Sequence, residues 1–394
     1  MEKFRIRTFN RIAPEGLSLF DNQYIVGPDV EDPHGIIVRS AKVDTEDFPS
    51  LCAVARAGAG VDNITIDKAT GQGICVFNAP GANANAVAEL VFVMAGIGAR
   101  NIHLAIDFCK ELSSFPDEKV SKQVEEKKST FRGFELAGKT LGVIGLGQVG
   151  VRVANGGAKR QMKTIGFDPS PALENVHLLS PDVILARSPG DVLRHADILT
   201  LHTPLNEKTR GYVNKELLGQ LPKGAMLINF CRKEIVDEQA VIEALNTGQL
   251  NSYVTDFPTR ETLKSPKVIP SPHLGASTEE SEEMSTVMAV KEVKAYLEHG
   301  TITHSVNFPT ADSIPADSVH TRLIMINRDT PGMIGFASQT IGAADINIAS
   351  YLNESNGDIG YNIIDLESAI PDDVAGRIKA HPDVIRTRVI QYKG

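Results

Sequence analysis

The apolar residues of this chain fall into short runs that alternate with segments long enough to form helices. In the first hundred residues these runs lie at 36–38, 51–55 and 74–77. Short apolar runs separated by helix-length segments are typical of strands that are buried on both faces of a parallel sheet. The pattern therefore predicts a small α/β domain at the start of the chain.

A second series of apolar runs begins near residue 139, and each run gives way to polar residues. The runs lie at 141–144, 163–168, 196–201, 225–230, 251–255 and 268–270. His202-Thr203, Cys231-Arg232 and His273 come after three of these runs. Because open parallel sheets bind ligands outside the carboxyl ends of their strands, we expect a site there.

The residues after a linker predicted at 309–319 follow a different order of elements. Strands are predicted at 321–327, 346–352, 358–366 and 384–390, with helices at 331–341 and 372–379. The order βαββαβ is that of a ferredoxin-like domain. Elsewhere we predict a buried helix over 82–106, an exposed connection over 110–133 and a helix over 277–299.

The run at 141–144 ends in the pattern G-x-G-x-x-G, formed by Gly145, Gly147 and Gly150. In a dinucleotide-binding fold the first glycine permits a tight turn, the second lets a pyrophosphate approach, and the third lets a helix pack closely. Gln148 and Val149 lie inside this turn, where the helix N-terminus faces the phosphates. The alternative is a glycine-rich turn in some other α/β protein.

Asp168 lies 18 residues after Gly150, close to the spacing of an acid that binds the adenosine ribose. A carboxylate at this position repels a 2′-phosphate, and Pro169-Ser170 supply no compensating arginine. The sequence therefore favours NAD over NADP as the cofactor.

Composition narrows the class of protein. The chain has 394 residues, 42% hydrophobic and 23% charged, which suits a globular protein of two or three domains. A formal net charge of −9 argues against nucleic acid as a partner, and it requires local cations for any anionic substrate. The four cysteines have no metal-binding spacing, so we expect reduced thiols, a cytoplasmic location and no metal. No apolar run approaches the ~20 residues that cross a bilayer, so we expect no membrane partner.

Arg232, Glu261 and His273 form a candidate catalytic set for oxidising a 2-hydroxy acid. Histidine is a suitable base near neutral pH, and an adjacent acid would orient it. Arginine offers a planar fork that matches a carboxylate. The alternative for a single histidine of this kind is a structural role, and arginines such as Arg39 and Arg56 are often only surface charge.

Several segments resemble the D-isomer-specific 2-hydroxyacid dehydrogenases. The matching segments are 56–63, 138–147, 202–205, 229–232 and 271–278, in the family's order. The resemblance covers about residues 1–305 and implies two doubly wound parallel-sheet domains, a Rossmann NAD domain and a flavodoxin-like substrate domain. It places the substrate domain at 1–97 and 276–308, and the dinucleotide-binding domain at 98–275.

The resemblance also implies roles for individual residues. His273 matches the general acid/base, Arg232 the residue that binds the substrate carboxylate, and Glu261 the acid that pairs with the histidine. Glu261 follows Asp256-Phe257-Pro258, where the family usually has Glu-Pro after Asp-Val-Phe. The implied cofactor contacts beyond the glycine-rich turn are Thr203, Phe230, Cys231, Asp256, Gly275 and Ala276.

The reaction that the resemblance implies is oxidation of 3-phospho-D-glycerate by NAD to 3-phosphohydroxypyruvate, the first step of serine synthesis. Arg39 matches a residue that holds the substrate phosphate, and Arg56 and Gly58 belong to the same substrate set. Many family members carry a second arginine where this chain has Ala41, so Lys42 or Arg56 is the substitute. The alternatives are a dehydrogenase for glycerate or lactate, and an NAD-sensing protein like the corepressors of the superfamily.

The segment 320–394 resembles ACT domains, which bind amino acids between paired copies. Asn327, Asp329 and Asn347 fall at the ligand positions, although serine-sensing members typically have His and Asn at the first two. The resemblance therefore implies a homodimer or homotetramer with L-serine as a possible effector. The alternative is a dimerisation module without a ligand, because a fold does not imply a function.

Overall fold

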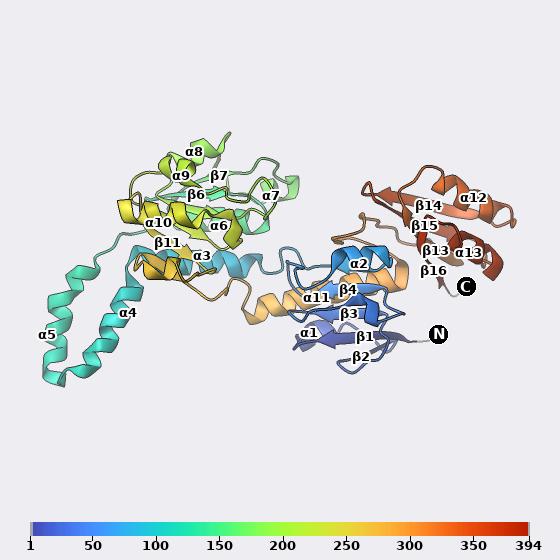
Figure 1. Ribbon diagram of the computed structural model, residues 1–394, viewed down its shortest axis with the longest axis horizontal. Helices are drawn as coiled ribbons and strands as arrows, with labels where there is room; N and C mark the ends of the chain where they lie inside the picture. The colour runs from blue at the N-terminus through green and yellow to red at the C-terminus, as the bar shows by residue number, and fades with distance from the viewer. Residues whose placement is uncertain (1–2, 393–394) are drawn as a thin grey trace. The chain divides into compact units, whose positions relative to one another are not determined.

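The computed structural model describes residues 3–392, which form two compact units (Figure 1). Unit 2 consists of residues 84–277, and unit 1 combines residues up to 83 with those from 278 onward. The predicted α/β class is confirmed in both units, since each contains a parallel sheet with intervening helices.

Unit 2 contains a parallel sheet of seven strands in the order β12-β11-β10-β9-β6-β7-β8. The strands are β6 (Thr140–Ile144), β7 (Lys163–Phe167), β8 (Val183–Leu185), β9 (Ile198–Leu201), β10 (Ala225–Asn229), β11 (Leu250–Thr255) and β12 (Val268–Pro270). Strands β7 and β8 follow β6 on one side of it, and the next strand, β9, lies on the other side of β6. This reversal is the order of dinucleotide-binding sheets, and it opens a crevice at the carboxyl ends of β6 and β9.

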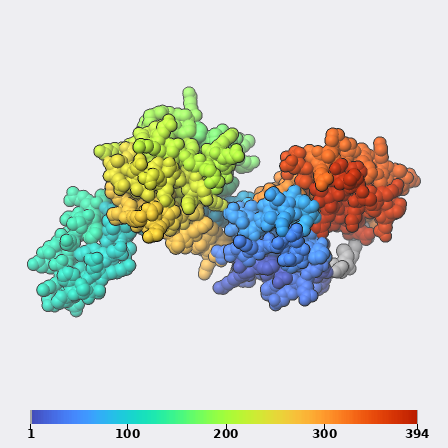
Figure 2. Space-filling model, in the orientation of Figure 1, coloured from blue at the N-terminus to red at the C-terminus, as the bar shows by residue number. Residues whose placement is uncertain are grey.

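Helices cover this sheet and extend from it. They are α3 (Ala84–Ala99), α4 (Ile102–Glu111), α5 (Asp117–Lys127), α6 (Gln148–Lys159), α7 (Leu173–His177), α8 (Pro189–Leu193), α9 (Lys215–Gly219) and α10 (Glu238–Thr247). The predicted connection over 110–133 is largely helical, and α4 and α5 have no buried residues. In Figure 2 the atoms of this helix pair stand apart from the rest of unit 2.

Helix α3 packs against α6, and this contact sets the boundary of unit 2. A Cβ atom at Gly156 of α6 would lie 2.5 Å from the ring of Phe92 on α3. At Gly157, the next residue, it would lie 2.6 Å from the Leu141 side chain of β6. The glycine pair therefore lets α6 contact both a helix and the sheet. Because α3 belongs to this core, unit 2 begins at Ala84.

Unit 1 contains a five-stranded parallel sheet and a four-stranded antiparallel sheet. The first has the order β2-β1-β3-β4-β5, with β1 (Phe4–Phe9), β2 (Tyr24–Gly27), β3 (Gly35–Val38), β4 (Ala53–Arg56) and β5 (Cys75–Phe77). Helices α1 (Pro14–Leu17), α2 (Ile66–Gly71) and α11 (Glu279–His299) accompany it. The order 2-1-3-4-5 is that of flavodoxin-like sheets, as predicted.

The C-terminal sheet has the order β14-β15-β13-β16. Its elements are β13 (Thr321–Arg328), α12 (Met333–Gly342), β14 (Ile348–Ser355), β15 (Ile359–Leu366), α13 (Asp372–Lys379) and β16 (Val384–Gln391). The predicted βαββαβ order is therefore confirmed. The division of the chain into three domains at 1–97 with 276–308, 98–275 and 320–394 stays a prediction.

Among residues 3–392 no single helix is long and apolar enough to cross a membrane. One helix pair bent by 62°, Ala84–Ala99 with Ile102–Ser114, meets the criterion jointly, by length and composition only.

Candidate active site

The glycine-rich turn follows β6 and has little room for side chains at two of its three glycines. Gly145 has a φ of +92°, and a Cβ atom there would lie 2.3 Å from the carbonyl oxygen of His202. At Gly150 a Cβ atom would lie 1.9 Å from the carbonyl oxygen of Gly145. At Gly147 no atom lies within 4 Å of that position, so the turn is open there. This arrangement fits a phosphate group that approaches the backbone at Gly147.

The N-terminus of α6 faces this opening. Gly147 is the N-cap residue and provides no side-chain acceptor for the first amides of the helix. The Gln148 side chain is engaged elsewhere, because its Nε2 donates to Asn175 at 2.8 Å. Val149 packs against the core of unit 2. An anion at this position would therefore meet backbone N–H groups and the positive end of the helix dipole.

Asp168 lies just after β7 and is fixed beside the turn. Its Oδ2 accepts a hydrogen bond from the Leu146 amide at 2.8 Å, and its Oδ1 accepts one from the Ser170 amide at 2.9 Å. The carboxylate is half-buried and has no ion pair with any cation of residues 3–392. It thus remains an acceptor at the edge of the glycine-rich turn, where the sequence predicts it.

The turn after β9 contains a half-buried imidazole and a buried hydroxyl. His202 Nε2 lies 3.0 Å from the Thr200 hydroxyl, and burial lowers the pKa of His202 to about 3. Thr203 Oγ1 is buried, and no hydrogen-bond partner for it lies within residues 3–392. A buried hydroxyl without a hydrogen-bond partner destabilises the folded protein, so this atom suits contact with a ligand that would complete its bonding.

The turn after β10 presents Arg232. Asn229 closes this turn, because its side chain donates to the Arg232 carbonyl at 3.0 Å and accepts from the Cys231 amide at 3.1 Å. The Cys231 thiol donates to the Leu201 carbonyl, and burial raises its pKa to about 12, which makes it a poor nucleophile. Phe230 is buried.

The guanidinium of Arg232 is available to bind an anionic ligand. It donates to the Cys231 carbonyl at 2.8 Å, and none of the ion pairs within residues 3–392 includes it. A partly buried arginine with an unneutralised charge is suited to a carboxylate, which it can bind through two parallel hydrogen bonds.

Asp256 follows β11 and lies close to His273. It is 2% exposed, and neither carboxylate oxygen has a hydrogen-bond partner within residues 3–392. Burial raises the pKa of Asp256, and the charges of His273 and Arg232 partly oppose that shift. Two of the three catalytic candidates, Arg232 and His273, therefore lie within electrostatic range of one carboxylate.

His273 itself is exposed and held in an unusual backbone conformation. Its φ is +52°, and its amide donates to the Asp256 carbonyl at 3.1 Å. The imidazole lies 4.8 Å from the Phe257 ring, centre to centre. A non-glycine residue with positive φ costs free energy, and such conformations concentrate at functional sites. The next glycine, Gly275, is buried, and a Cβ atom there would lie 3.6 Å from Asp256 Oδ2, whereas Ala276 is exposed.

Glu261 is not paired with His273 in this structure. It precedes a short 3-10 helix (Thr262–Lys264) and forms an ion pair with Lys264 at 2.6 Å. Its side chain is 55% exposed, so little free energy holds that pair together. The role of Glu261 beside His273 stays a prediction.

The predicted substrate residues Arg39, Arg56 and Gly58 lie in unit 1. Arg39 follows β3 and forms an ion pair with Glu282 of α11 at 2.6 Å. Arg56 ends β4, and its Nε donates to the Arg39 carbonyl at 2.9 Å. A Cβ atom at Gly58 would lie 3.7 Å from the Arg56 guanidinium. These three residues therefore gather at the carboxyl ends of the neighbouring strands β3 and β4.

The three candidate effector residues are not together within one chain. Asn327 is 2% exposed, and its side chain bonds Asn362 and the Arg328 carbonyl. Asp329 accepts from the Ser355 hydroxyl. Asn347 lies next to Ile348, the first residue of β14, which is level with Thr321 at the start of β13. Asn327 lies near the end of β13, level with the other end of β14. Asn347 and Asn327 thus lie at opposite ends of the sheet, about 20 Å apart at ~3.3 Å per strand residue.

Three contributing residues were not predicted from the sequence. Asn229 lies in the recognised segment 229–232, so its turn-forming role could have been anticipated from its position. Asn10 accepts hydrogen bonds from the backbone amides of Ser40 and Ala41, next to Arg39, and Glu282 pairs with Arg39. Neither residue gave such a signal, because strand β1 was not predicted and Glu282 is one of several acids in its helix.

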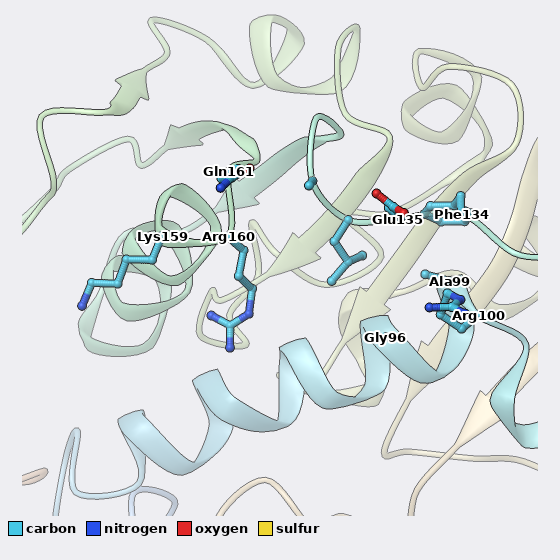
Figure 3. Close-up of a pocket in the computed structure, with 10 residues that line it drawn as sticks. Gly96, Ala99, Arg100, Phe134, Glu135, Lys159, Arg160 and Gln161 are labelled. Atoms are coloured by element: carbon cyan, nitrogen blue, oxygen red, sulfur yellow. The ribbon is translucent and has the colours of Figure 1, made fainter.

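A pocket of about 520 Å³ lies at the other edge of the sheet of unit 2 (Figure 3). It is lined by the end of α3, residues 134–137 before β6, and residues 159–161 before β7. Because these segments precede their strands, the pocket is at the amino edge. None of the predicted site residues lines it.

Comparisons with known proteins identify the family. Residues 102–275 match the model described as D-isomer specific 2-hydroxyacid dehydrogenase, NAD binding domain. A D-3-phosphoglycerate dehydrogenase of Haemophilus influenzae is 31% identical over 377 residues, which cover 92% of this chain and 87% of that protein. The chain therefore belongs to the D-isomer specific 2-hydroxyacid dehydrogenase family. The predicted family and the predicted NAD-binding domain are both confirmed.

Other relatives narrow the position within the family. The D-3-phosphoglycerate dehydrogenase of Bacillus subtilis is 35% identical over 327 residues, 78% of this chain. The chain spans only 59% of the length of that relative. The solved structure of an NAD+-bound 3-phosphoglycerate dehydrogenase from Entamoeba histolytica is 27% identical with a TM-score of 0.61, and the match covers 77% of this chain and 99% of that one.

Proposed function

We propose that the protein oxidises 3-phospho-D-glycerate to 3-phosphohydroxypyruvate with NAD, the first step of L-serine synthesis. The observation that carries this proposal is the position of Arg232 and His273. Both follow strands whose carboxyl ends share one sheet edge with the glycine-rich turn, and both lie within electrostatic range of Asp256. The similarity to D-3-phosphoglycerate dehydrogenases supports the choice of substrate.

The described residues fit NAD. The open side of Gly147 and the N-terminus of α6 suit the pyrophosphate, and Asp168 suits the ribose hydroxyls. Within residues 3–392, Thr203 Oγ1 and the Asp256 carboxylate oxygens are buried polar atoms without a hydrogen-bond partner, and Asp256 suits the nicotinamide carboxamide. Phe230, Cys231, Gly275 and Ala276 are proposed as further contacts. When bound, NAD supplies the acceptor for the hydride.

Each remaining residue has a defined task in the proposed reaction. Arg232 binds the substrate carboxylate through its planar fork. His273 Nε2 or Nδ1 takes the proton of the C2 hydroxyl while the hydride leaves C2, so that a 2-oxo acid forms. Glu261 leaves Lys264 and stabilises the protonated imidazole. Arg39, with Arg56 and Gly58, binds the phosphate.

An initial-rate assay tests this function. The wild-type protein should form NADH from 3-phospho-D-glycerate, with a higher kcat/KM than from D-glycerate or D-lactate. His273→Gln should lower kcat by about 10²- to 10⁴-fold, because it removes the proton acceptor. Equal turnover by the variant, or no NADH from 3-phospho-D-glycerate, would contradict the proposal.

A dehydrogenase for an unphosphorylated 2-hydroxy acid is the second candidate. The Arg39–Glu282 ion pair favours it, because a neutralised arginine attracts a phosphate less strongly. The same assay decides between the two, since this candidate requires D-glycerate or D-lactate to be the better substrate.

We further propose that the C-terminal sheet is an ACT domain that binds L-serine between two copies of the chain. Asn327 and Asn347 are about 20 Å apart within one chain, so one serine molecule cannot contact both of them there. It could contact Asn327 of one chain and Asn347 of another if the two sheets pack in opposite directions. This proposal entails a homodimer or homotetramer. A cytoplasmic location and the three-domain division are proposed on the family resemblance.

A further inference from the structure

Arg39 is already paired with an acid of its own unit. Its Nη2 lies 2.6 Å from Oε1 of Glu282, in the first turn of α11. The two side chains are 37% and 40% exposed, so both remain reachable from solvent. An incoming anion at Arg39 must therefore compete with this carboxylate.

The backbone beside Arg39 offers an anion little help. Asn10 Oδ1 accepts hydrogen bonds from the amides of Ser40 at 2.9 Å and Ala41 at 2.8 Å. These are the amides that would otherwise face a ligand after β3. Because they are already bonded, anion binding at this strand end depends on side-chain cations such as Arg39.

The backbone of Glu282 is firmly held. Thr278 caps α11 by accepting from the Ser281 amide at 3.1 Å, and the Glu282 amide donates to the Thr278 carbonyl. A Cβ atom at Gly16 of α1 would lie 2.5 Å from the Thr286 side chain, so α1 and α11 are in close contact. Helix α11 has no room to withdraw toward α1, and the Glu282 carboxylate can leave Arg39 only by rotation of its side chain.

We propose that Glu282 competes for Arg39 with the phosphate of the substrate and thereby sets how tightly the protein binds that phosphate. This inference rests on the proposed function. A phosphate monoester carries up to two negative charges and displaces the single carboxylate charge. A substrate that offers only another carboxylate, or a hydroxyl, gains nothing by the exchange. The pair therefore weakens phosphate binding without preventing it.

The variant Glu282→Gln tests the competition, because glutamine keeps the shape and removes the charge. The KM for 3-phospho-D-glycerate should fall about three- to fivefold, which is the change in affinity expected when a half-exposed ion pair no longer competes. The kcat should stay within twofold of wild type. The KM for D-glycerate should not change. Glu279→Gln is the matched control, since it removes the same charge from the same helical turn without contacting Arg39, and its KM values should equal those of wild type.

Titration calorimetry with inorganic phosphate separates this inference from the proposed function. Phosphate should bind Glu282→Gln about three- to fivefold more tightly than wild type, and Arg39→Ala should abolish the difference between Glu and Gln at 282. Tighter phosphate binding without turnover of 3-phospho-D-glycerate by any variant would reject the function and support the competition. Turnover by wild type, with KM and phosphate affinity unchanged or weaker in Glu282→Gln, would reject the competition.

Discussion

Two residues of the candidate site contain buried polar atoms that a ligand could satisfy. Thr203 and Asp256 each bury oxygen atoms without a hydrogen-bond partner among residues 3–392. Leaving such a group unpaired costs about 1–3 kcal/mol, so folds retain it mainly where a ligand completes the bonding. Thr203 and Asp256 both follow strands of the sheet that carries the glycine-rich turn. The unsatisfied oxygen atoms therefore lie at the predicted cofactor site.

His202 makes stability depend on pH. Burial depresses its folded-state pKa to about 3, below the ordinary value of 6.5. Its contribution to stability is therefore fully present above pH 6.5 and is lost as the pH falls toward 3. Between pH 7.5 and pH 5 the loss is about 2 kcal/mol, at about 1.4 kcal/mol per pH unit below 6.5. His202→Gln should lose less free energy of unfolding over this interval, measured by urea denaturation.

The exposed His195 provides the control for this measurement. His195→Gln should show the same change in the free energy of unfolding between pH 7.5 and pH 5 as wild type. If His202→Gln also shows the wild-type change, burial of the neutral imidazole does not contribute as described.

Among single residues, the sequence predicted which residues lie at the candidate site better than it predicted the partners of their side chains. Gly145, Gly150 and Asp168 lie where their spacing predicts, because a strand, a turn and a helix of fixed length connect them. The partners of Glu261 and Arg39 were not predictable in the same way. Lys264 and Glu282 are ordinary charged residues in the sequence, and only the folded backbone brings them to their partners.

At the scale of elements, close packing explains the two adjacent glycines of α6. Glycine in a helix costs roughly 1 kcal/mol relative to alanine, so its presence twice needs a compensating contact. Gly156 faces Phe92 of α3, and Gly157 faces Leu141 of β6 and Thr164 of β7. The helix that presents its N-terminus to the glycine-rich turn is thereby held tightly on the sheet.

Gly157→Ala should destabilise the protein by about 1–3 kcal/mol, because the added methyl group would lie 2.6 Å from the Leu141 side chain. Gly96→Ala in α3 is the control, since no atom lies within 4 Å of its Cβ position. That change should be neutral or stabilise by up to about 1 kcal/mol. Calorimetric melting of both variants measures the effects, and a Gly157→Ala protein that melts at or above the wild-type temperature would contradict this packing.

Elements with a strong pattern were predicted, and those with a weak one were missed. The strands β9 and β10 are largely apolar and almost wholly buried, and they were predicted within a few residues. Strand β1, with the sequence FRIRTF, alternates with arginine and was missed. The charged segment that forms α5 was predicted as a connection, since it has no apolar face that a core would bury.

At the scale of the whole molecule, the C-terminal sheet gives a test of regulation. L-serine at about millimolar concentration should lower the initial rate with 3-phospho-D-glycerate if the proposed ACT site binds it. Asn347→Ala should then relieve the inhibition with little effect on the uninhibited rate, because Asn347 is exposed and lies far along the sheet from Asn327. Rates that are identical with and without serine would leave the sheet as a dimerisation module.

The central claim is that this chain removes a hydride from C2 of 3-phospho-D-glycerate and a proton from the attached hydroxyl. The most direct measurement uses substrate that carries deuterium at C2, with mass spectrometry of the reduced cofactor. The deuterium should be found on the nicotinamide ring of the NADH formed by wild type, and His273→Gln should form little labelled product. Reduced cofactor without deuterium, or no reduced cofactor at all from wild type, would contradict it.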